Sequence, residues 1–199
     1  MIAHAVLDRA DRMNRKFWET IFDQPFPGEI VTDKLILIAS YVDLALEHQS
    51  AITFLVRHHH TGSAMALVRP VYEMLYRGIW ILGCATEADA EKARRDRLTW
   101  PEMGRVVKEA DDAFDGDGFL TQLKKKNWKV VNSYTHSGAL QTGSRFSGNE
   151  LHPSYADHEQ IHAVEGTLIA AGLLAVPFLK IHGRFSQAEE IERLLLELS

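Results

Sequence analysis

The sequence predicts an all-α fold, an up-and-down bundle of four or five long helices with shorter accessory helices packed around it. Nearly every segment repeats its apolar residues at the helical period, and no segment shows the alternation that is typical of a half-buried strand. Clusters of Gly, Pro, Ser, Asn and Asp separate these segments. The 199 residues are long enough for one substantial core, so we expect a single helical domain over 1–199.

The N-terminal third of the chain contains two predicted helices. The first spans 3–22 and ends at the turn formed by Pro25–Gly28. Thr32 or Asp33 is suited to cap the second helix, which runs to about His59. Its apolar period predicts an inward face made of Leu37, Tyr41, Leu44, Ala45, His48, Ile52, Leu55 and His59.

The third predicted helix begins at Ser63 and runs to about Cys84. Pro70 lies inside it and should kink the helix or shift its start, because proline has no N–H to donate. Residues 141–154 are rich in turn formers and are expected to form a loop. The remaining predicted helices span 87–98, 101–113, 119–126, 128–140, 155–182 and 186–198.

Composition and charge exclude several classes of partner. A net charge of −5 gives no general attraction to nucleic acid or to anionic lipid. The longest apolar run, 166–179, is too short to span a bilayer and contains Pro177, so it predicts a buried helix. The charged N-terminus is unlike a signal peptide, and the single Cys84 fits a reducing compartment. We therefore expect a cytoplasmic protein without a membrane partner, which forms a homodimer.

A polar stripe interrupts the third helix, which is apolar on its other sides. Arg69 and Glu73 are four residues apart, and Tyr76 and Trp80 continue the same face. One interpretation is a structural ion pair at the surface of the bundle. The other is a guanidinium and a carboxylate that face an internal pocket.

A second polar stripe follows in the segment from Trp128 to Ser137. Ser133, His136 and Ser137 fall on one helical face and are suited to pack against Arg69 and Glu73. Hydrogen bonding of these side chains within the core is the alternative. The two stripes together give the candidate residues of a ligand pocket, namely Arg69, Glu73, Tyr76, Ser133, His136 and Ser137.

The segment His158-Glu159-Gln160-Ile161-His162 has the spelling of a zinc-peptidase motif. The two histidines share a helical face, Glu159 is a candidate base, and Glu165 is a candidate third ligand. Catalytic zinc needs three protein ligands and an open position, and one helix rarely supplies three. The alternative is a pair of surface histidines at a helix start. We predict that these residues hold no catalytic zinc and that the protein uses no cofactor.

Arg145 and His152 have a spacing within the range of the Arg-x(4–6)-His motif of HEPN ribonucleases, which are also helical bundles. Gly148 and Pro153 make this stretch a loop rather than the start of a helix. The ribonuclease hypothesis is the one case in which nucleic acid would be a partner.

The segments A-L-V-R-P-V-Y-E at 66–73 and W-K-V-V-N-S-Y-T-H-S at 128–137 together resemble uncharacterised bacterial helical proteins. These proteins pair an Arg-x-x-x-Glu helix with a later Ser-x-x-His helix and are distantly similar to abortive-infection and HEPN-like proteins. The resemblance implies an all-helical bundle and matches Arg69, Glu73, Ser133 and His136. It implies no established activity.

Three functions are therefore open. The first is a helical bundle that binds a small ligand or a partner through an internal polar pocket, with a role in stress or phage defence. The second is a metal-dependent hydrolase that uses His158, Glu159 and His162. The third is a HEPN-like ribonuclease that uses Arg145 and His152. The sequence does not decide whether the protein is an enzyme.

Overall fold

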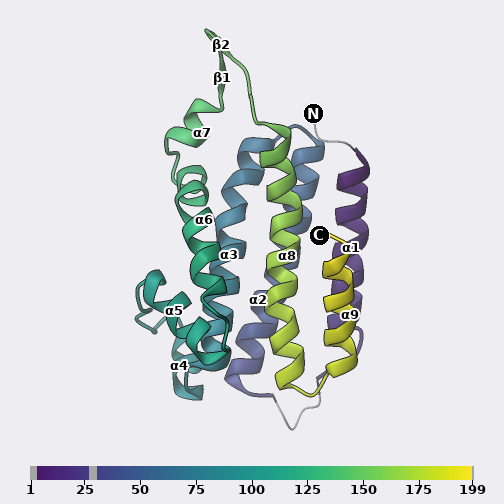
Figure 1. Cartoon of the computed structure of the whole chain (residues 1–199), viewed down its shortest axis with the longest axis vertical. Helices are drawn as coiled ribbons and strands as arrows, with labels where there is room; N and C mark the ends of the chain where they lie inside the picture. Colours follow the sequence, from purple (N-terminus) through teal and green to yellow (C-terminus); the bar gives the residue numbers. More distant parts are fainter. Residues whose placement is uncertain (1–3, 27–30, 199) are drawn as a thin grey trace.

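The computed structural model describes residues 4–26 and 31–198, and over these residues the fold is all-α (Figure 1). The all-α prediction is confirmed. Most of the long helices run roughly along one axis, and a short β-hairpin projects from one end of the bundle (Figure 1). The helices are α1 His4–Phe22, α2 Asp33–Arg57, α3 Thr61–Gly83, α4 Glu87–Arg94, α5 Met103–Ala113, α6 Phe119–Thr135, α7 Ala139–Gly143, α8 Asp157–Ile181 and α9 Phe185–Leu196.

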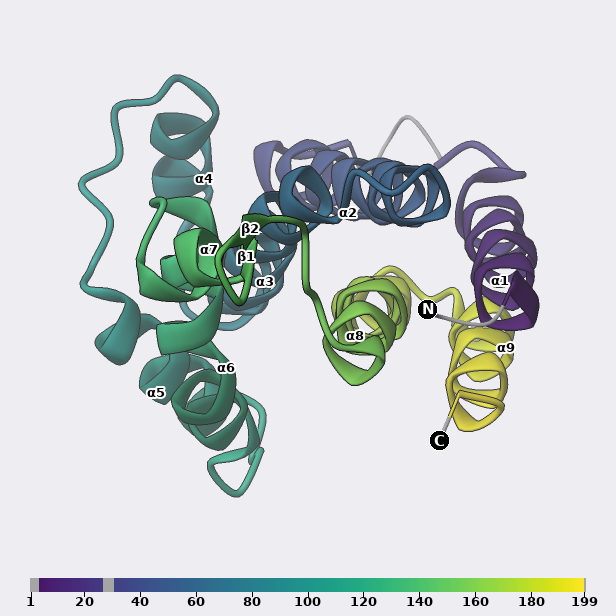
Figure 2. The ribbon, with the colours of Figure 1, turned by 90° about the horizontal axis from the view of Figure 1, so that it is seen from above.

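Helix α8 lies centrally, between α3 on one side and α1 and α9 on the other (Figure 2). Helix α6 packs on α3 and stands apart from α8, so α3 joins the two (Figure 2). The contact of α3 with α8 is close, because an added Cβ at Gly78 would lie 2.5 Å from a methyl carbon of Leu174. The buried apolar side chains form one connected core cluster.

Helix α2 buries a different face from the one that its apolar pattern predicts. Leu37, Ala45 and Ile52 are buried as expected, but Leu44 is 41% exposed. His59 lies outside the helix with a φ of 62°. The buried face is centred one position further along the helix, because the polar residues Gln49 and Thr53 belong to the core. Its residues are Leu35, Leu37, Ile38, Val42, Ala45, Leu46, Gln49, Ile52, Thr53 and Val56.

Pro70 neither breaks α3 nor moves its start to a later residue. The helix begins at Thr61, before the predicted cap Ser63, and continues through the proline to Gly83. Proline cannot donate to the carbonyl four residues earlier. The Thr135 hydroxyl of α6 donates to this carbonyl, Ala66 O, at 3.2 Å, and shares its proton with Val131 O of its own helix at 3.0 Å. The packing of α6 therefore replaces the hydrogen bond that Pro70 removes.

Helix α6 is one continuous element where the sequence predicts two. Its start is fixed by the buried Asp111 of α5, whose Oδ1 accepts from Leu120 N at 2.8 Å and whose Oδ2 accepts from Thr121 N at 2.9 Å. Its end comes at Thr135, earlier than predicted, because Ser137 adopts a φ of 54°.

The predicted loop at 141–154 contains more structure than expected. The end of α7 lies within it, and residues 146–151 form a β-hairpin in which β1, Phe146–Ser147, pairs antiparallel with β2, Glu150–Leu151. Phe146 and Leu151 face each other across the hairpin and are 56% and 74% exposed. Strands this short carry too few alternating positions to be recognised in a sequence.

By length and composition alone, α2 and α8 are apolar enough to cross a membrane. Core helices of water-soluble proteins meet the same criteria. The prediction that the apolar run at 166–179 belongs to a buried helix is confirmed, because the residues of α8 that it covers contribute Leu168, Ala171, Leu174 and Phe178 to the core.

Candidate functional site

Arg69 and Glu73 form the ion pair that their spacing predicts. Arg69 Nη2 donates to Glu73 Oε1 at 2.9 Å, and the two side chains are 21% and 22% exposed. Both lie on the side of α3 that faces α6, since the Arg69 guanidinium stands 5.4 Å from the ring centre of Trp128. The pair is therefore partly withdrawn from water and is held against an aromatic ring.

His136 completes this arrangement at the end of α6. Its Nε2 lies in hydrogen-bond contact with Arg69 Nη1. A guanidinium only donates, so Nε2 is the acceptor in this contact. Arg69, Glu73 and His136 are thus brought together, as the two polar stripes predict.

The other three predicted pocket residues, Tyr76, Ser133 and Ser137, make different contacts. Tyr76 is fully buried with its ring 6.0 Å from that of Trp128. Ser133 Oγ accepts a hydrogen bond from Leu140 N at 3.0 Å, and Ser137 is exposed at the end of α6. Neither serine is hydrogen-bonded to His136 in the described part of the chain, so His136 is not positioned as a base for either of them here.

Two further residues of this region are not indicated by their spacing in the sequence. Arg77, two turns after Arg69, places its guanidinium 4.8 Å from the ring centre of Trp100. Asn132 lies between Trp128 and His136 on the same side of α6. We name this set the polar face. It comprises Arg69, Glu73 and Arg77 of α3 with Trp128, Asn132 and His136 of α6.

Buried polar atoms without a partner concentrate on the same two helices. In residues 4–26 and 31–198, every buried side-chain nitrogen or oxygen that lacks a hydrogen bond belongs to α3 or α6. Buried polar atoms are nearly always paired with protein or water, so we expect these atoms to be paired with ordered water or with a ligand. The atoms are Arg69 Nε, Tyr76 Oη, Arg77 Nε, Asn127 Nδ2 and Asn132 Oδ1.

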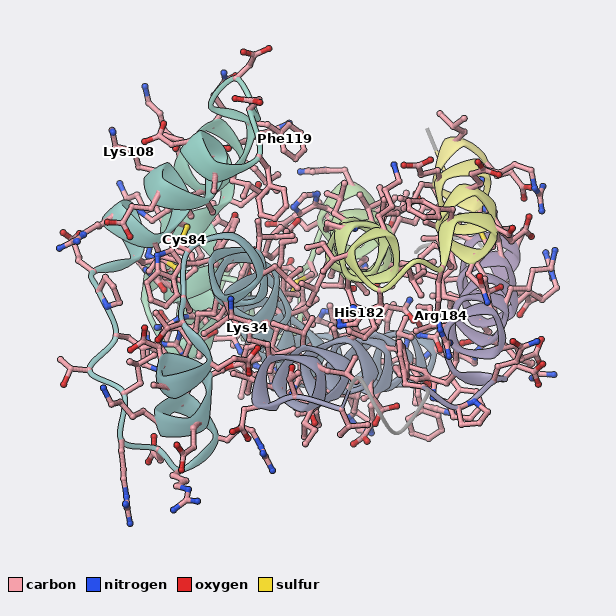
Figure 3. The ribbon with its side chains drawn as sticks, turned by 90° about the horizontal axis from the view of Figure 1, so that it is seen from below. Lys34, Cys84, Lys108, Phe119, His182 and Arg184 are labelled. Carbon is pink, nitrogen blue, oxygen red and sulfur yellow. The ribbon has the colours of Figure 1, made fainter. Side chains whose placement is uncertain are left out.

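An apolar groove runs between α6 and α8, on the other side of α6 from the polar face. Met65, Val68 and Tyr72 of α3 line it together with residues of α6 and α8. It consists of two neighbouring cavities of about 380 and 370 Å³, which share His158 and His162 as lining residues. Phe119 stands at the end of the groove where α6 begins (Figure 3).

Most of the exposed lining of this groove is apolar, but several polar side chains also border it. Asn127 is 7% exposed, and its Nδ2 is one of the unpaired atoms. Burial, and secondarily the nearby ammonium group of Lys126, lower the pKa of His162, so its imidazole is neutral at pH 7. Lys126 is exposed and lies at the edge of the groove.

The residues of the zinc-peptidase motif line the same groove but are engaged in other contacts. Glu159 Oε2 accepts from Ala156 N at 2.8 Å and so caps the start of α8. Its Oε1 accepts from the Tyr134 hydroxyl at 2.6 Å, and Glu165 forms an ion pair with Arg9. No group of three His, Cys, Asp or Glu side chains suited to hold a metal ion occurs among the described residues.

Arg145 and His152 flank the β-hairpin. The strand register pairs Phe146 with Leu151, so Arg145 and His152 lie next to this pair at the base of the hairpin. His152 Nδ1 is hydrogen-bonded to Pro153 O at 2.8 Å. The two residues thus lie beside a hairpin and not at the start of a helix.

Of the comparisons with known proteins, the one with family models covers most of these elements. No curated protein and no solved structure matches the chain. A family model described as a family of unknown function, DUF6988, matches residues 42–195. This range contains the polar face and the groove completely. The chain belongs to the DUF6988 family of unknown function.

Proposed function

We propose that this protein binds an elongated, mostly apolar small molecule in the groove between α6 and α8, with an oxygen-bearing end of the ligand at Asn127. The observation that carries the proposal is the Asn127 amide, which lines the groove and whose Nδ2 is buried without a partner. Leaving a buried donor unpaired costs about 1–3 kcal/mol, and a ligand oxygen would remove that cost. Pockets for small ligands combine an apolar lining with a few such polar groups.

The dimensions of the groove favour a slender ligand. Along α8 the lining extends from His158 to Leu173, which is about 22 Å at 1.5 Å per residue. The two cavities, of about 380 and 370 Å³, each lie in the size range of small-ligand pockets and together suit an extended hydrocarbon chain.

One cation at the edge of the groove favours a negatively charged end beside it. Glu165 forms an ion pair with Arg9, whereas Glu159 accepts from two neutral donors, Ala156 N and the Tyr134 hydroxyl. Lys126 has no carboxylate partner within the described ranges, so its ammonium group is available to an anion. A long-chain carboxylate satisfies both groups, because its oxygens accept from Asn127 Nδ2 while its charge is attracted to Lys126.

The proposal is tested by isothermal titration of the protein with dodecanoate. We expect one molecule to bind per chain. Val130 lines the groove and is 40% exposed, so Val130→Asp places a carboxylate there without disturbing the core, and it should weaken binding at least tenfold. Val31, which is 49% exposed and does not line the groove, provides the matched control Val31→Asp. Equal affinity of Val130→Asp and the parent would contradict the proposal.

The Asn127→Leu variant tests the orientation of the ligand. Leucine has a similar volume and removes the unpaired donor, so the protein should remain folded. We expect the affinity for dodecanoate to fall while the affinity for dodecanol changes less, because the lost hydrogen bond is stronger for a charged acceptor. An unchanged affinity for dodecanoate would remove Asn127 from the site.

A further inference from the structure

We infer that Phe119 limits the length of the bound chain and makes the groove selective for medium-chain carboxylates, an inference that rests on the proposed function. Phe119 is the first residue of α6 and lines the second cavity of the groove, of about 370 Å³. It also lines a third cavity of about 170 Å³, which is bordered by α3, α5 and α8. Leu173 of α8 is the other residue that lines both. These two side chains therefore stand at the boundary between the second and third cavities.

The apolar chain of the ligand runs toward Phe119 rather than toward Tyr134. The Tyr134 hydroxyl donates to Glu159 Oε1 at 2.6 Å, and this hydrogen bond crosses the groove from α6 to α8. A hydrocarbon chain placed there would withdraw the Glu159 carboxylate from water, which is costly. In the other direction the lining of the groove is mostly apolar, and the carboxylate that borders it, Glu165, is paired with Arg9.

The separation of Asn127 and Phe119 sets the length of chain that fits between them. Both residues belong to α6, and the helix rises by about 12 Å from one to the other at 1.5 Å per residue. A fully extended polypeptide advances about 3.5 Å over three backbone bonds, so an extended carbon chain advances about 1.2 Å per bond. About ten bonds therefore fit between the two side chains. Decanoate and dodecanoate meet this limit, whereas longer chains must pass Phe119.

The backbone of Phe119 is held in place at this end of the groove (Figure 3). Its N–H donates to Gly116 O at 2.7 Å. The next two amides, those of Leu120 and Thr121, donate to the buried carboxylate of Asp111. The ring can therefore move only by rotation of its side chain, which is confined to a few preferred rotamers. A long chain has to displace the ring from its rotamer, and a shorter chain does not.

The third cavity is suited to receive the end of a longer chain once the Phe119 ring is removed. Its lining is mostly apolar and includes Ala110 and Pro177. Asp111 also borders it, but its carboxylate is engaged with backbone amides of α6. Leu173 and Pro177 are one turn of α8 apart, about 6 Å, which holds about five further bonds. Removal of the ring should therefore raise the limit from about twelve to about sixteen carbon atoms.

The experiment is isothermal titration of the whole protein with decanoate, dodecanoate, tetradecanoate and hexadecanoate, each below the concentration at which it forms micelles. Burial of one methylene group raises the affinity about fourfold. The parent should show this gain from decanoate to dodecanoate and little gain beyond. Phe119→Ala should bind hexadecanoate more tightly than dodecanoate by roughly tenfold or more. Leu140→Ala is the matched control and should keep the parent's profile, because Leu140 is 43% exposed, against 50% for Phe119, and lines the other end of the groove.

The inference would be overturned by a parent whose affinity rises steadily to hexadecanoate, by a Phe119→Ala profile equal to the parent's, or by a changed profile in Leu140→Ala alone. Each of these results leaves the proposed function intact, because dodecanoate still binds. Absence of binding by every carboxylate would overturn the proposed function and this inference with it. Should Phe119→Ala fail to fold, Phe119→Trp decides, since its larger ring should weaken the binding of dodecanoate more than that of decanoate.

Discussion

Gln49 is fully buried between three helices and organises a polar contact inside the core. Its Nε2 donates to Thr53 Oγ1 and to Val164 O, both at 3.1 Å, and its Oε1 accepts from Asn14 Nδ2 at 2.5 Å. A pattern of apolar residues assigns such a glutamine to the surface, and this is why the predicted inward face of α2 is displaced. Only the approach of α1 and α8 supplies the partners that make its burial possible.

Replacement of Gln49 by alanine should therefore be costly. The change leaves a cavity and removes one partner of Asn14 and the side-chain donor to Val164 O, so we expect the free energy of unfolding to fall by about 3 kcal/mol. Gln122→Ala, an exposed position of α6, is the matched control and should change it by less than about 0.5 kcal/mol. Urea unfolding followed by circular dichroism measures both. A small effect at Gln49 would show that water replaces its hydrogen bonds.

Residues of the polar face divide between those that a sequence can reveal and those that it cannot. The contact of Arg69 with Glu73 follows from helical spacing, and that of Arg69 with His136 follows from matching two stripes. Arg77 has no such signal, because its neighbour Trp100 lies in a connection whose path is set by tertiary packing.

At the scale of elements, helix type was easier to predict than helix limits. The long helices follow from their apolar period, but their ends depend on contacts from other elements. The start of α6 is held by Asp111 of α5. The helix then continues through residues 126–128, where the sequence predicts a break between two helices. Pro70 is accommodated inside α3 because the Thr135 hydroxyl of α6 donates a hydrogen bond to the Ala66 carbonyl, which Pro70 leaves without its usual donor.

The compensation of Pro70 by Thr135 can be measured as a coupling energy. Thr135→Val keeps the shape of the side chain and leaves Ala66 O unpaired, so it should destabilise the protein by about 1–2 kcal/mol. Pro70→Ala restores a backbone donor to that carbonyl. In the Pro70→Ala background, Thr135→Val should therefore cost about 1 kcal/mol less. Urea unfolding of the parent, the two single variants and the double variant gives the four free energies of unfolding that the cycle needs.

Thr142 provides the control for this cycle. Its hydroxyl also donates to a backbone carbonyl, Gly138 O, but at an exposed site where water can substitute. Thr142→Val should have nearly the same small effect with or without Pro70. Equal costs of Thr135→Val in the two backgrounds would mean that the Ala66 carbonyl does not depend on the Thr135 hydroxyl.

At the scale of the whole molecule, the groove is the feature that the sequence hides most completely. Its three helices are distant in the chain, and it arises because α6 and α8 both pack on α3 without closing on each other (Figure 2). The histidines that resemble a metal site from sequence line its wall. Their chemistry depends on burial, which no spacing of residues specifies.

The burial of His162 predicts how global stability varies with pH. Its pKa in the folded protein lies below the value of about 6.5 expected in the unfolded chain. The unfolded state therefore binds the proton first, and stability is lost as the pH falls through 6.5 toward the folded pKa. We expect His162→Gln to lose less stability than the parent between pH 7.5 and 5.5.

Urea unfolding at several pH values measures this difference. The variant His60→Gln, which changes an exposed histidine, should follow the parent. A His162→Gln profile parallel to the parent's over the whole range would show that His162 is equally basic in the folded and unfolded states.

The exposed hairpin of β1 and β2 lies directly before the central helix α8 in the chain. A protease that cut the backbone between Ser147 and Glu150 would therefore divide the protein into one piece with α1 to α7 and another with α8 and α9. The second piece would stay in place after the cut, because its apolar side chains are enclosed by those of the first. The hairpin thus marks a point at which the gene could be divided and the two products made to reassemble, with the walls of the groove on separate polypeptides.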